Sequence, residues 1–339
     1  MNTDSSVPHG GSAHEAHADE SGSAGTAWIK VAVALLIVYV VWGSTYLFIR
    51  IVTEEAPPLT SMGQRYLVAG LLLGALLALR GGVRRLRVTR RQLAGAALLG
   101  LLLPMMGNGL VAVAESNGAT SGFTALLIAV APLAIVVFRT VEHDRPRAMT
   151  LVGVLTGFGG LALLVVLGRN TGDRIPLLAA LTVLFAGTCW AFGSYIQPRL
   201  WLPRDPFVVA VYEMLCGGVI LLVVGLSAGE RISFDHTART WLALAYLVVF
   251  GSVVAFTAYV WVIANAPISL VATYAYVNPV VAVFLGWVVL GESVTATMLL
   301  GGGIVVASVA VVISAERLGR KPIPPAEPDC EPRGTSVGA

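Results

Sequence analysis

The sequence predicts an all-α membrane protein of ten transmembrane helices, arranged as two inverted five-helix repeats. Charged residues make up only 12% of the 339 residues, whereas soluble domains carry about 25%. Ten apolar windows are each about 20 residues long, enough to cross the ~30 Å hydrocarbon core. A helix-turn-helix pattern also recurs 148 residues later, for example from Trp42 to Trp190. Together these observations indicate a duplicated membrane bundle.

The ten windows are predicted to be helices because backbone groups in lipid must pair internally, and barrel strands would alternate apolar and polar residues. Apart from Lys30 at an entry, only two windows contain a charge, Arg65 in the second and Glu213 in the seventh. The windows are residues 29–49, 59–79, 92–114, 118–138, 148–168, 176–197, 206–226, 241–264, 268–290 and 295–315.

Five landmarks define the repeat. At an offset of 147 or 148 they are Trp42 and Trp190, Pro58 and Pro206, Arg65 and Glu213, Gly70 and Gly218, and Pro132 and Pro279. Because each copy holds an odd number of helices, the second copy enters the membrane from the opposite side. The repeats are therefore expected to be related by an axis in the membrane plane.

Lysines and arginines predict the orientation. One side of the predicted topology carries 15 of them and the other carries 5. By the positive-inside rule, both termini should be cytoplasmic in a multi-pass protein of the cytoplasmic (inner) membrane. The arginine-rich loop at residues 80–91 is read as part of this signal, so no nucleic-acid partner is expected.

The predicted organisation has four parts. Residues 1–28 and 316–339 are expected to be disordered cytoplasmic tails because they lack an apolar pattern. The first five-helix repeat is placed at 29–168 and the second at 176–315. No loop is long enough to fold as a separate domain.

Several motifs resemble the EamA-type drug/metabolite transporters, a superfamily of ten-helix membrane proteins. They are Trp42-Gly43-Ser44-Thr45-Tyr46, Pro57-Pro58, Arg65, Ala69-Gly70, Ala264-Asn265-Ala266-Pro267, Tyr276-Val277-Asn278-Pro279 and Leu290-Gly291-Glu292. The resemblance covers about residues 30–315. It implies a basket of ten helices around a central cavity, in a protein that transports small metabolites, often outward. The stretch Glu142 to Pro146 departs from the family pattern at the turn between helices four and five.

Charged and polar side chains at membrane depth are the candidate binding groups, because they are costly in lipid and should face the bundle interior. Arg65 and Glu213 are repeat counterparts that either pair or each hold a substrate group; Arg65 could instead reach the extracellular face. A buried charge without any partner is the least expected arrangement.

Other candidates lie on helices three and nine. Asn108 and Glu115 are seven residues apart and can share a helix face. Glu115 lies near the outer end of helix three and is expected to be exposed to solvent. Tyr274 and Asn278 share a face beside Pro279, which is expected to break the helix. Trp42, Trp190 and Trp261 could wall the cavity or pack structurally. The predicted substrate-binding set is Trp42, Ser44, Arg65, Asn108, Trp190, Glu213, Tyr274 and Asn278.

These features favour a secondary transporter, an exporter of small metabolites or drugs that works by alternating access. Glu213 is the candidate proton-coupling residue. Two alternatives are an intramembrane enzyme and a structural or sensory membrane subunit. The chain contains no Walker loop, and the enzyme-like string Gly225 to Gly229 ends a membrane helix rather than a strand. We expect no metal and no cofactor; the partners are a small-molecule substrate and the lipid bilayer, and the oligomeric state is open.

Overall fold

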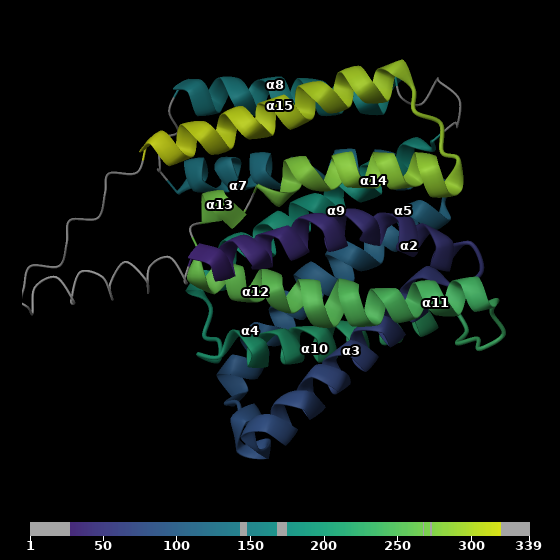
Figure 1. Cartoon of the computed structure of the whole chain (residues 1–339), viewed down its shortest axis with the longest axis vertical. Helices are drawn as coiled ribbons and strands as arrows, with labels where there is room; N and C mark the ends of the chain where they lie inside the picture. The colour runs from purple at the N-terminus through teal and green to yellow at the C-terminus, as the bar shows by residue number, and fades with distance from the viewer. Residues whose placement is uncertain (1–27, 143–147, 168–174, 267, 272, 320–339) are drawn as a thin grey trace, which may run out of the picture.

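A computed structural model describes residues 28–142, 148–167, 175–266, 268–271 and 273–319. Every regular element in these residues is helical, and the long helices lie side by side in one bundle (Figure 1). The predicted all-α membrane fold is confirmed.

Among the described residues, eight helices are long and apolar enough to cross a membrane. They are Trp28–Thr53, Pro58–Gly81, Arg90–Ser116, Ser121–Val141, Ala148–Leu167, Leu177–Arg199, Pro206–Ser227 and Ala238–Asn265. Two shorter apolar helices, Val277–Leu290 and Ala296–Val312, follow. Together they account for the ten predicted windows.

Several spans contain more than one helical segment. In chain order the elements used below are η1 (Val38–Trp42), α2 (Gly43–Thr53), α3 (Pro58–Gly81), η2 (Val83–Leu86), α4 (Arg90–Gly100), η3 (Leu101–Gly109), α5 (Leu110–Ser116), α6 (Ser121–Ile128), α7 (Val130–Val141), α8 (Ala148–Leu167), α9 (Leu177–Ile196), η5 (Gln197–Arg199), α10 (Pro206–Ser227), α11 (Ala238–Tyr246), η6 (Leu247–Val254), α12 (Ala255–Asn265), α13 (Ile268–Val271), α14 (Tyr274–Leu290) and α15 (Ala296–Gly319).

Three spans widen into π-helical turns in their middle, at η1, η3 and η6. Pro104 lies inside η3 and removes one backbone hydrogen bond there. Short π-helical segments inside α-helices are frequent at functional sites. The three segments therefore mark the middle of the bundle as the region to inspect.

The ninth span differs from the prediction. Pro279 lies inside α14, which continues through it to Leu290, whereas the interruption between α13 and α14 comes before Tyr274. Proline at this position removes the bond to the carbonyl of Ala275 but does not end the helix. The prediction that the helix breaks at Pro279 is therefore wrong, because the interruption lies before Tyr274.

Glycines on α3 and α10 reveal the relation between the repeats. A Cβ on Gly70 would lie 2.9 Å from Leu215, and a Cβ on Gly218 would lie 2.8 Å from Leu67. Gly70 corresponds to Gly218, and Leu67 to Leu215, at the predicted offset of 148. If α3 and α10 exchange places, the contact of Gly70 with Leu215 becomes the contact of Gly218 with Leu67. Gly63 against Leu222 and Gly74 against Val211 are exchanged in the same way.

The pair α8 and α15 obeys the same relation. Gly153 faces Val312, and its counterpart Gly301 faces Leu164, each with 2.8 Å between the added Cβ and the nearest side-chain carbon. The two helices lie together along one edge of the bundle (Figure 1). Both helix pairs therefore straddle a pseudo-twofold axis, as inverted repeats require.

The first described span begins and α15 ends at the same end of the bundle (Figure 1). We call this end the proximal face. The opposite end, the distal face, carries the segments that contain Glu55, Glu230 and Glu292. The helix α15 extends past the boundary predicted at residue 315, and the rest of both predicted tails lies outside the described residues.

Candidate functional site

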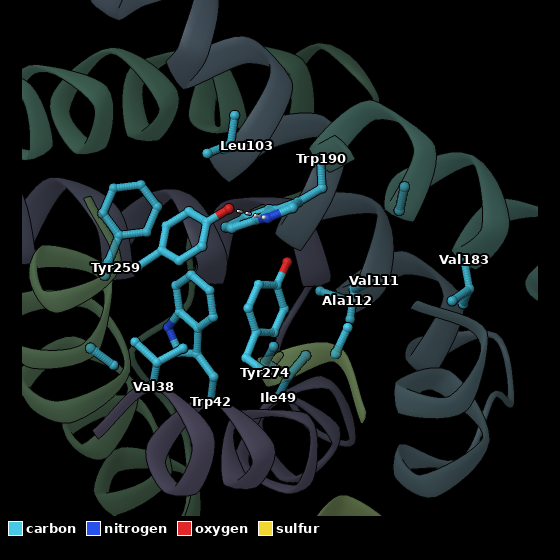
Figure 2. Packing of buried hydrophobic residues seen from close by; sticks show 14 of the residues in the cluster. Val38, Trp42, Ile49, Leu103, Val111, Ala112, Val183, Trp190, Tyr259 and Tyr274 are labelled. Atoms are coloured by element: carbon cyan, nitrogen blue, oxygen red, sulfur yellow. Dashed lines mark hydrogen bonds between the residues drawn. The ribbon is translucent and has the colours of Figure 1, made fainter. Parts of the chain in front are cut away.

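The repeat counterparts Trp42 and Trp190 touch each other in the middle of the bundle. Their ring centroids are 5.3 Å apart and their planes meet at 86°, an edge-to-face arrangement. Tyr259 lies 4.5 Å and Tyr274 lies 5.6 Å from the Trp42 ring (Figure 2). An aromatic cluster therefore occupies the place where the two repeats meet.

The polar atoms of this cluster are held by specific hydrogen bonds. Trp42 Nε1 donates to the carbonyl of Gly251 at 3.2 Å. Trp190 Nε1 donates to Tyr259 Oη at 3.3 Å (Figure 2), and Ser194 Oγ shares a hydrogen bond with the same hydroxyl at 2.8 Å. The rings are therefore fixed in orientation rather than packed only by shape.

A cavity opens beside the two tryptophans. Four predicted binding residues line it, Trp42, Asn108, Trp190 and Tyr274, together with Thr45, Tyr46, Gly107, Val111 and Ile128. The Asn108 side chain makes no hydrogen bond with the described residues, so its amide is available to a ligand. The wall thus combines aromatic faces with an amide and hydroxyl groups, the usual composition of a small-molecule site.

The cavity is small in this conformation. Its cavity volume is about 40 Å³. A single water needs ~10–15 Å³ on this measure, so the space suits about two or three waters or one small group. A larger ligand therefore requires the walls to move.

Two predicted residues face away from the cavity. The Ser44 hydroxyl donates to the carbonyl of Val41 and shares a hydrogen bond with Tyr246 on α11, both at 2.7 Å. The Asn278 amide nitrogen is placed to donate to the carbonyls of Tyr39 at 3.0 Å and Tyr274 at 3.3 Å. Both side chains join helices to each other in this conformation.

Arg65 is buried on α3 and is only 1% exposed. Its Nε donates to Ser252 Oγ on η6 at 2.9 Å, and its guanidinium carbon lies 4.8 Å from the centre of the Tyr66 ring. The side chain therefore does not reach the distal surface. It also forms no ion pair with Glu213.

Glu213 is fully buried on α10, and both carboxyl oxygens lack a hydrogen-bond partner among the described residues. The repeat supplies a reason. The partner of Arg65 is Ser252, and the position equivalent to Ser252 is Pro104. Proline offers neither a hydroxyl nor a backbone N–H. The arrangement expected least, a buried ionisable group without a partner, is the one the structure contains.

Glu115 contradicts its prediction as well. Its side chain near the end of α5 is 0% exposed, not wet, and its carboxyl oxygens have no partner in the described part of the chain. Arg50 on α2 covers this end of α5 by donating to the backbone carbonyl of Glu115. The position of Glu115 near the end of its helix did not predict its burial, because Arg50 of another helix covers it.

Carboxylates on the distal face hold helix N-termini of the other repeat. Glu230 accepts from the backbone N–H groups of Leu59 and Thr60, and Glu292 accepts from those of Ser121 and Gly122. These bonds satisfy donors that a helix start leaves unpaired.

Glu55 does the same for the start of α11. The backbone N–H of Thr237, with the hydroxyls of Thr240 and Thr237, holds the pKa of the Glu55 carboxyl below its usual value. All three caps join one repeat to the other.

The proximal face is also closed by contacts between the repeats. Arg85 in η2 forms an ion pair of 2.7 Å with Asp205, and Tyr212 Oη donates to the carbonyl of Leu86 at 2.6 Å. Glu142 pairs with Arg199 at 2.8 Å; the rest of the predicted departure, residues 143–146, lies outside the described residues. Contacts between repeats thus tie both ends of the bundle together.

A polar hollow lies on the distal face, with a wall of charged side chains and backbone turns. Its lining residues are Arg50, Glu54, Gly118, Thr120, Arg239, Val289, Leu290, Gly291 and Glu292. We call it the distal vestibule. Glu54 pairs with Arg239 at 3.4 Å and lies 3.9 Å from Arg50. The vestibule is therefore lined by both signs of charge.

Sequence reasoning missed several residues of the cavity wall and of the adjoining aromatic cluster. Thr45 and Tyr46 belong to the same motif as Trp42, so the motif could have revealed them. Tyr259 carried no such signal, since its place beside Trp42 and Trp190 depends on how α12 packs. Trp261 is not among the cavity residues. Within the described residues, no group of three or more His, Cys, Asp or Glu side chains is placed to hold a metal ion.

Comparison with known proteins agrees with this architecture. The model of the EamA-like transporter family matches the chain twice, at residues 29–166 and 177–314. The two matches are offset by 148 residues, the spacing of Trp42 and Trp190.

Individual relatives point the same way. The chain is 39% identical over 279 residues to an uncharacterized inner membrane transporter, YedA, of Escherichia coli K12, covering 82% of this chain and 89% of YedA. It is 25% identical to the threonine/homoserine exporter RhtA of the same strain, over 52% of this chain and 57% of RhtA.

A solved structure titled "Crystal structure of protein" shares the fold at 19% identity, with a TM-score of 0.61, over 86% of this chain and 99% of that one. The repeated family match, the inverted helix pairs and the extended similarity to YedA lead to one conclusion. The chain belongs to the EamA-like transporter family.

Proposed function

We propose that this membrane transporter is a secondary exporter of small, amino-acid-sized metabolites that works by alternating access. The observation that carries the proposal is the cavity beside Trp42 and Trp190, placed where the two inverted repeats meet. Inverted repeats bind their substrates at this interface and expose the site to each side in turn.

The cavity wall supports the substrate class. Aromatic faces suit an apolar or cationic part of a ligand, and the unpaired Asn108 amide suits a carboxylate or amide group. The printed name of RhtA, a threonine/homoserine exporter, supports amino acids as the first compounds to test.

The closed faces support the mechanism. Both the distal caps and the proximal Arg85–Asp205 pair join one repeat to the other. Opening either face requires breaking one of these sets while the other holds. Since the cavity is too small for most metabolites here, substrate entry requires such an opening.

The orientation proposal places both termini in the cytoplasm of an inner-membrane protein. Its support is the excess of lysine and arginine on the proximal loops. Fusions of a fluorescent protein and of alkaline phosphatase to each terminus test this orientation. The fluorescent protein is active on the cytoplasmic side, and alkaline phosphatase is active only in the periplasm.

A transport assay tests the function directly. The purified protein is reconstituted in liposomes, and counterflow of labelled threonine, homoserine, other amino acids, nucleosides and cationic drugs is measured with and without a pH gradient. We expect saturable flux of at least one amino-acid-sized compound. Absence of flux for all classes would remove the proposal.

Variants locate the site. Trp42→Ala, Trp190→Ala and Asn108→Ala should each lower flux, the tryptophan changes by about tenfold or more, because each removes an aromatic wall. Trp201→Ala is the matched control, since Trp201 is exposed outside the cavity. Equal losses in the control and the cavity variants would argue against this site.

Proton coupling through Glu213 is a further part of the proposal. It is supported by the burial of Glu213, whose carboxyl has no hydrogen-bond partner within the described residues. Glu213→Gln should reduce the dependence of flux on a pH gradient while counterflow at equal pH persists. A variant that keeps its full gradient dependence would eliminate this role.

A further inference from the structure

Glu115 differs from the other glutamates of the distal face. Glu55, Glu230 and Glu292 each accept hydrogen bonds from a helix start of the other repeat. The Glu115 carboxyl is fully buried and accepts none from the described residues. Nothing in the capping arrangement explains why a carboxyl is kept here.

The position of Glu115 is defined by its neighbours along two helices. On α5, Val111 lies one turn before Glu115 and lines the central cavity, whereas Gly118 just beyond the helix lines the distal vestibule. On the facing helix α2, Tyr46 lines the cavity and Arg50, one turn later, lines the vestibule. Glu115 therefore lies between the two spaces.

The Glu115 carboxyl forms no ion pair within the described residues. Arg50 attracts it from a distance, but the Arg50 guanidinium donates to the backbone carbonyl of Glu115 and lies 3.9 Å from the carboxylate of Glu54. Glu292 adds a negative charge from the segment after α14, and Tyr46 on α2 also faces the carboxyl. In the described part of the chain, the other helices packed on α5, namely α3, α6 and α9, add no charged group to this set.

A fully buried carboxyl that forms no ion pair is strongly disfavoured in its ionised form. A proton removes the charge and needs no extra room. A metal ion would need several oxygen ligands, and neither carboxyl oxygen has a polar partner here. The geometry therefore suits the proton as the ligand.

We propose that Glu115 is a proton-binding site that links protonation to closure of the distal face. This inference rests on the proposed transporter function, since it assumes that the distal face opens. With the proton bound, α2 and α5 remain packed and Arg50 covers the end of α5. When the proton leaves, the carboxylate requires water or Arg50, and both become available when α2 separates from α5 and the vestibule joins the cavity.

The expected pH dependence has a definite sign. Raising the pH on the distal side removes the proton and favours the open distal face, and lowering it favours closure. A single linked proton changes the ratio of open to closed molecules by at most about tenfold per pH unit. Glu213 lies on a different helix and is not part of this linkage.

Cysteine labelling tests the proposal without any substrate. Val111→Cys is introduced in a chain whose own cysteines, Cys189, Cys216 and Cys330, are replaced by alanine. The labelling rate with a membrane-impermeant thiol reagent is measured from the distal side between pH 5 and pH 8. The same substitution at the exposed Ser227 corrects for the reagent's own pH dependence.

We expect the corrected rate at position 111 to rise several-fold with pH. Glu115→Gln should make it slow and independent of pH, Glu115→Asp should restore part of the rise, and Asp235→Asn, on the exposed loop after α10, should leave the rise unchanged. A pH-dependent rate that survives Glu115→Gln, or a rate that is flat with Glu115 intact, would overturn the proposal. Thermal unfolding of each purified variant checks that it is folded.

Failure of the two proposals is distinguishable. If no compound is transported but labelling responds to pH through Glu115, the proposed substrate class is wrong and the proton site stands. If transport is observed and labelling does not respond, the proton site is wrong and the exporter proposal stands.

Discussion

The two helices at the centre of the bundle, α3 and α10, share one packing geometry and carry opposite chemistry. Gly70 against Leu215 and Gly218 against Leu67 are the same contact seen from both sides of the pseudo-twofold axis. At the equivalent positions 65 and 213, one helix presents a bonded arginine and the other a glutamate without a hydrogen-bond partner in the described part of the chain. The duplication therefore preserved the small residues that let helices approach, while the polar groups diverged.

The difference extends to the neighbouring helices. Ser252 gives Arg65 a hydrogen-bond acceptor, and Pro104, at the equivalent position, gives Glu213 no donor. A transporter with two identical halves would offer the same groups to both sides of its cavity. Divergence at these positions makes the two halves chemically distinct without altering the shared packing.

The largest expected effect concerns the symmetric packing. A Cβ on Gly218 would lie 2.8 Å from the backbone nitrogen of Leu67, which cannot move aside, whereas a Cβ on Gly70 first meets the Leu215 side chain at 2.9 Å. We expect Gly218→Ala to lower the free energy of unfolding by ~3 kcal/mol and Gly70→Ala by less. Thermal unfolding in detergent measures both.

The control for this prediction is Gly159→Ala on α8, where nothing lies within 4 Å of the added Cβ. Alanine should be neutral there or stabilise by up to ~1 kcal/mol, because it favours the helix. If Gly218→Ala behaved like Gly159→Ala, the close approach of α3 and α10 would be in doubt.

An intermediate effect concerns the partners of Arg65 and Glu213. Ser252→Ala removes the acceptor of a buried charged donor and should destabilise the protein by ~1.5 kcal/mol. Pro104→Ser places a hydroxyl at the equivalent position beside α10 and should stabilise the protein, unless Glu213 is replaced by leucine at the same time. Unfolding of the single and double variants forms a cycle that isolates the new contact. No coupling between positions 104 and 213 would contradict the symmetric assignment.

The smallest expected effect concerns Glu55, whose pKa is lowered chiefly by the backbone N–H of Thr237. Because the folded protein favours the ionised form, the stabilisation is fully present above the ordinary value of 4.5 and is lost as the pH falls through the lowered pKa. Glu55→Gln should therefore flatten the loss of stability below pH 4.5. The free energy of unfolding measured from pH 7 downward checks this. If its pH dependence is the same in Glu55→Gln and in the original protein, protonation of Glu55 does not affect stability.

The sequence predicted most of the architecture, because its signals are local or periodic. Apolar windows gave the ten helices, and the offset between Trp42 and Trp190 predicted the repeat that the family matches and the glycine contacts bear out. Four of the eight predicted binding residues, including Asn108, line one cavity. Ser44 faces another helix, since residues one or two positions away from a wall residue point in different directions on a helix. Asn278 shares a helix face with Tyr274, but its amide is placed against the backbone carbonyls of Tyr39 and Tyr274 rather than in the cavity.

What the sequence by itself determined is the number of spans, the duplication and the antiparallel relation of the two halves, because these follow from hydropathy and spacing along one chain. Only the tertiary structure decided that Arg50 covers Glu115, that Trp42 meets Trp190 and that Glu213 has no hydrogen-bond partner among the residues that the structure describes. Burial and partnership depend on side chains supplied by helices distant in the chain, and no local pattern states which helix will supply them.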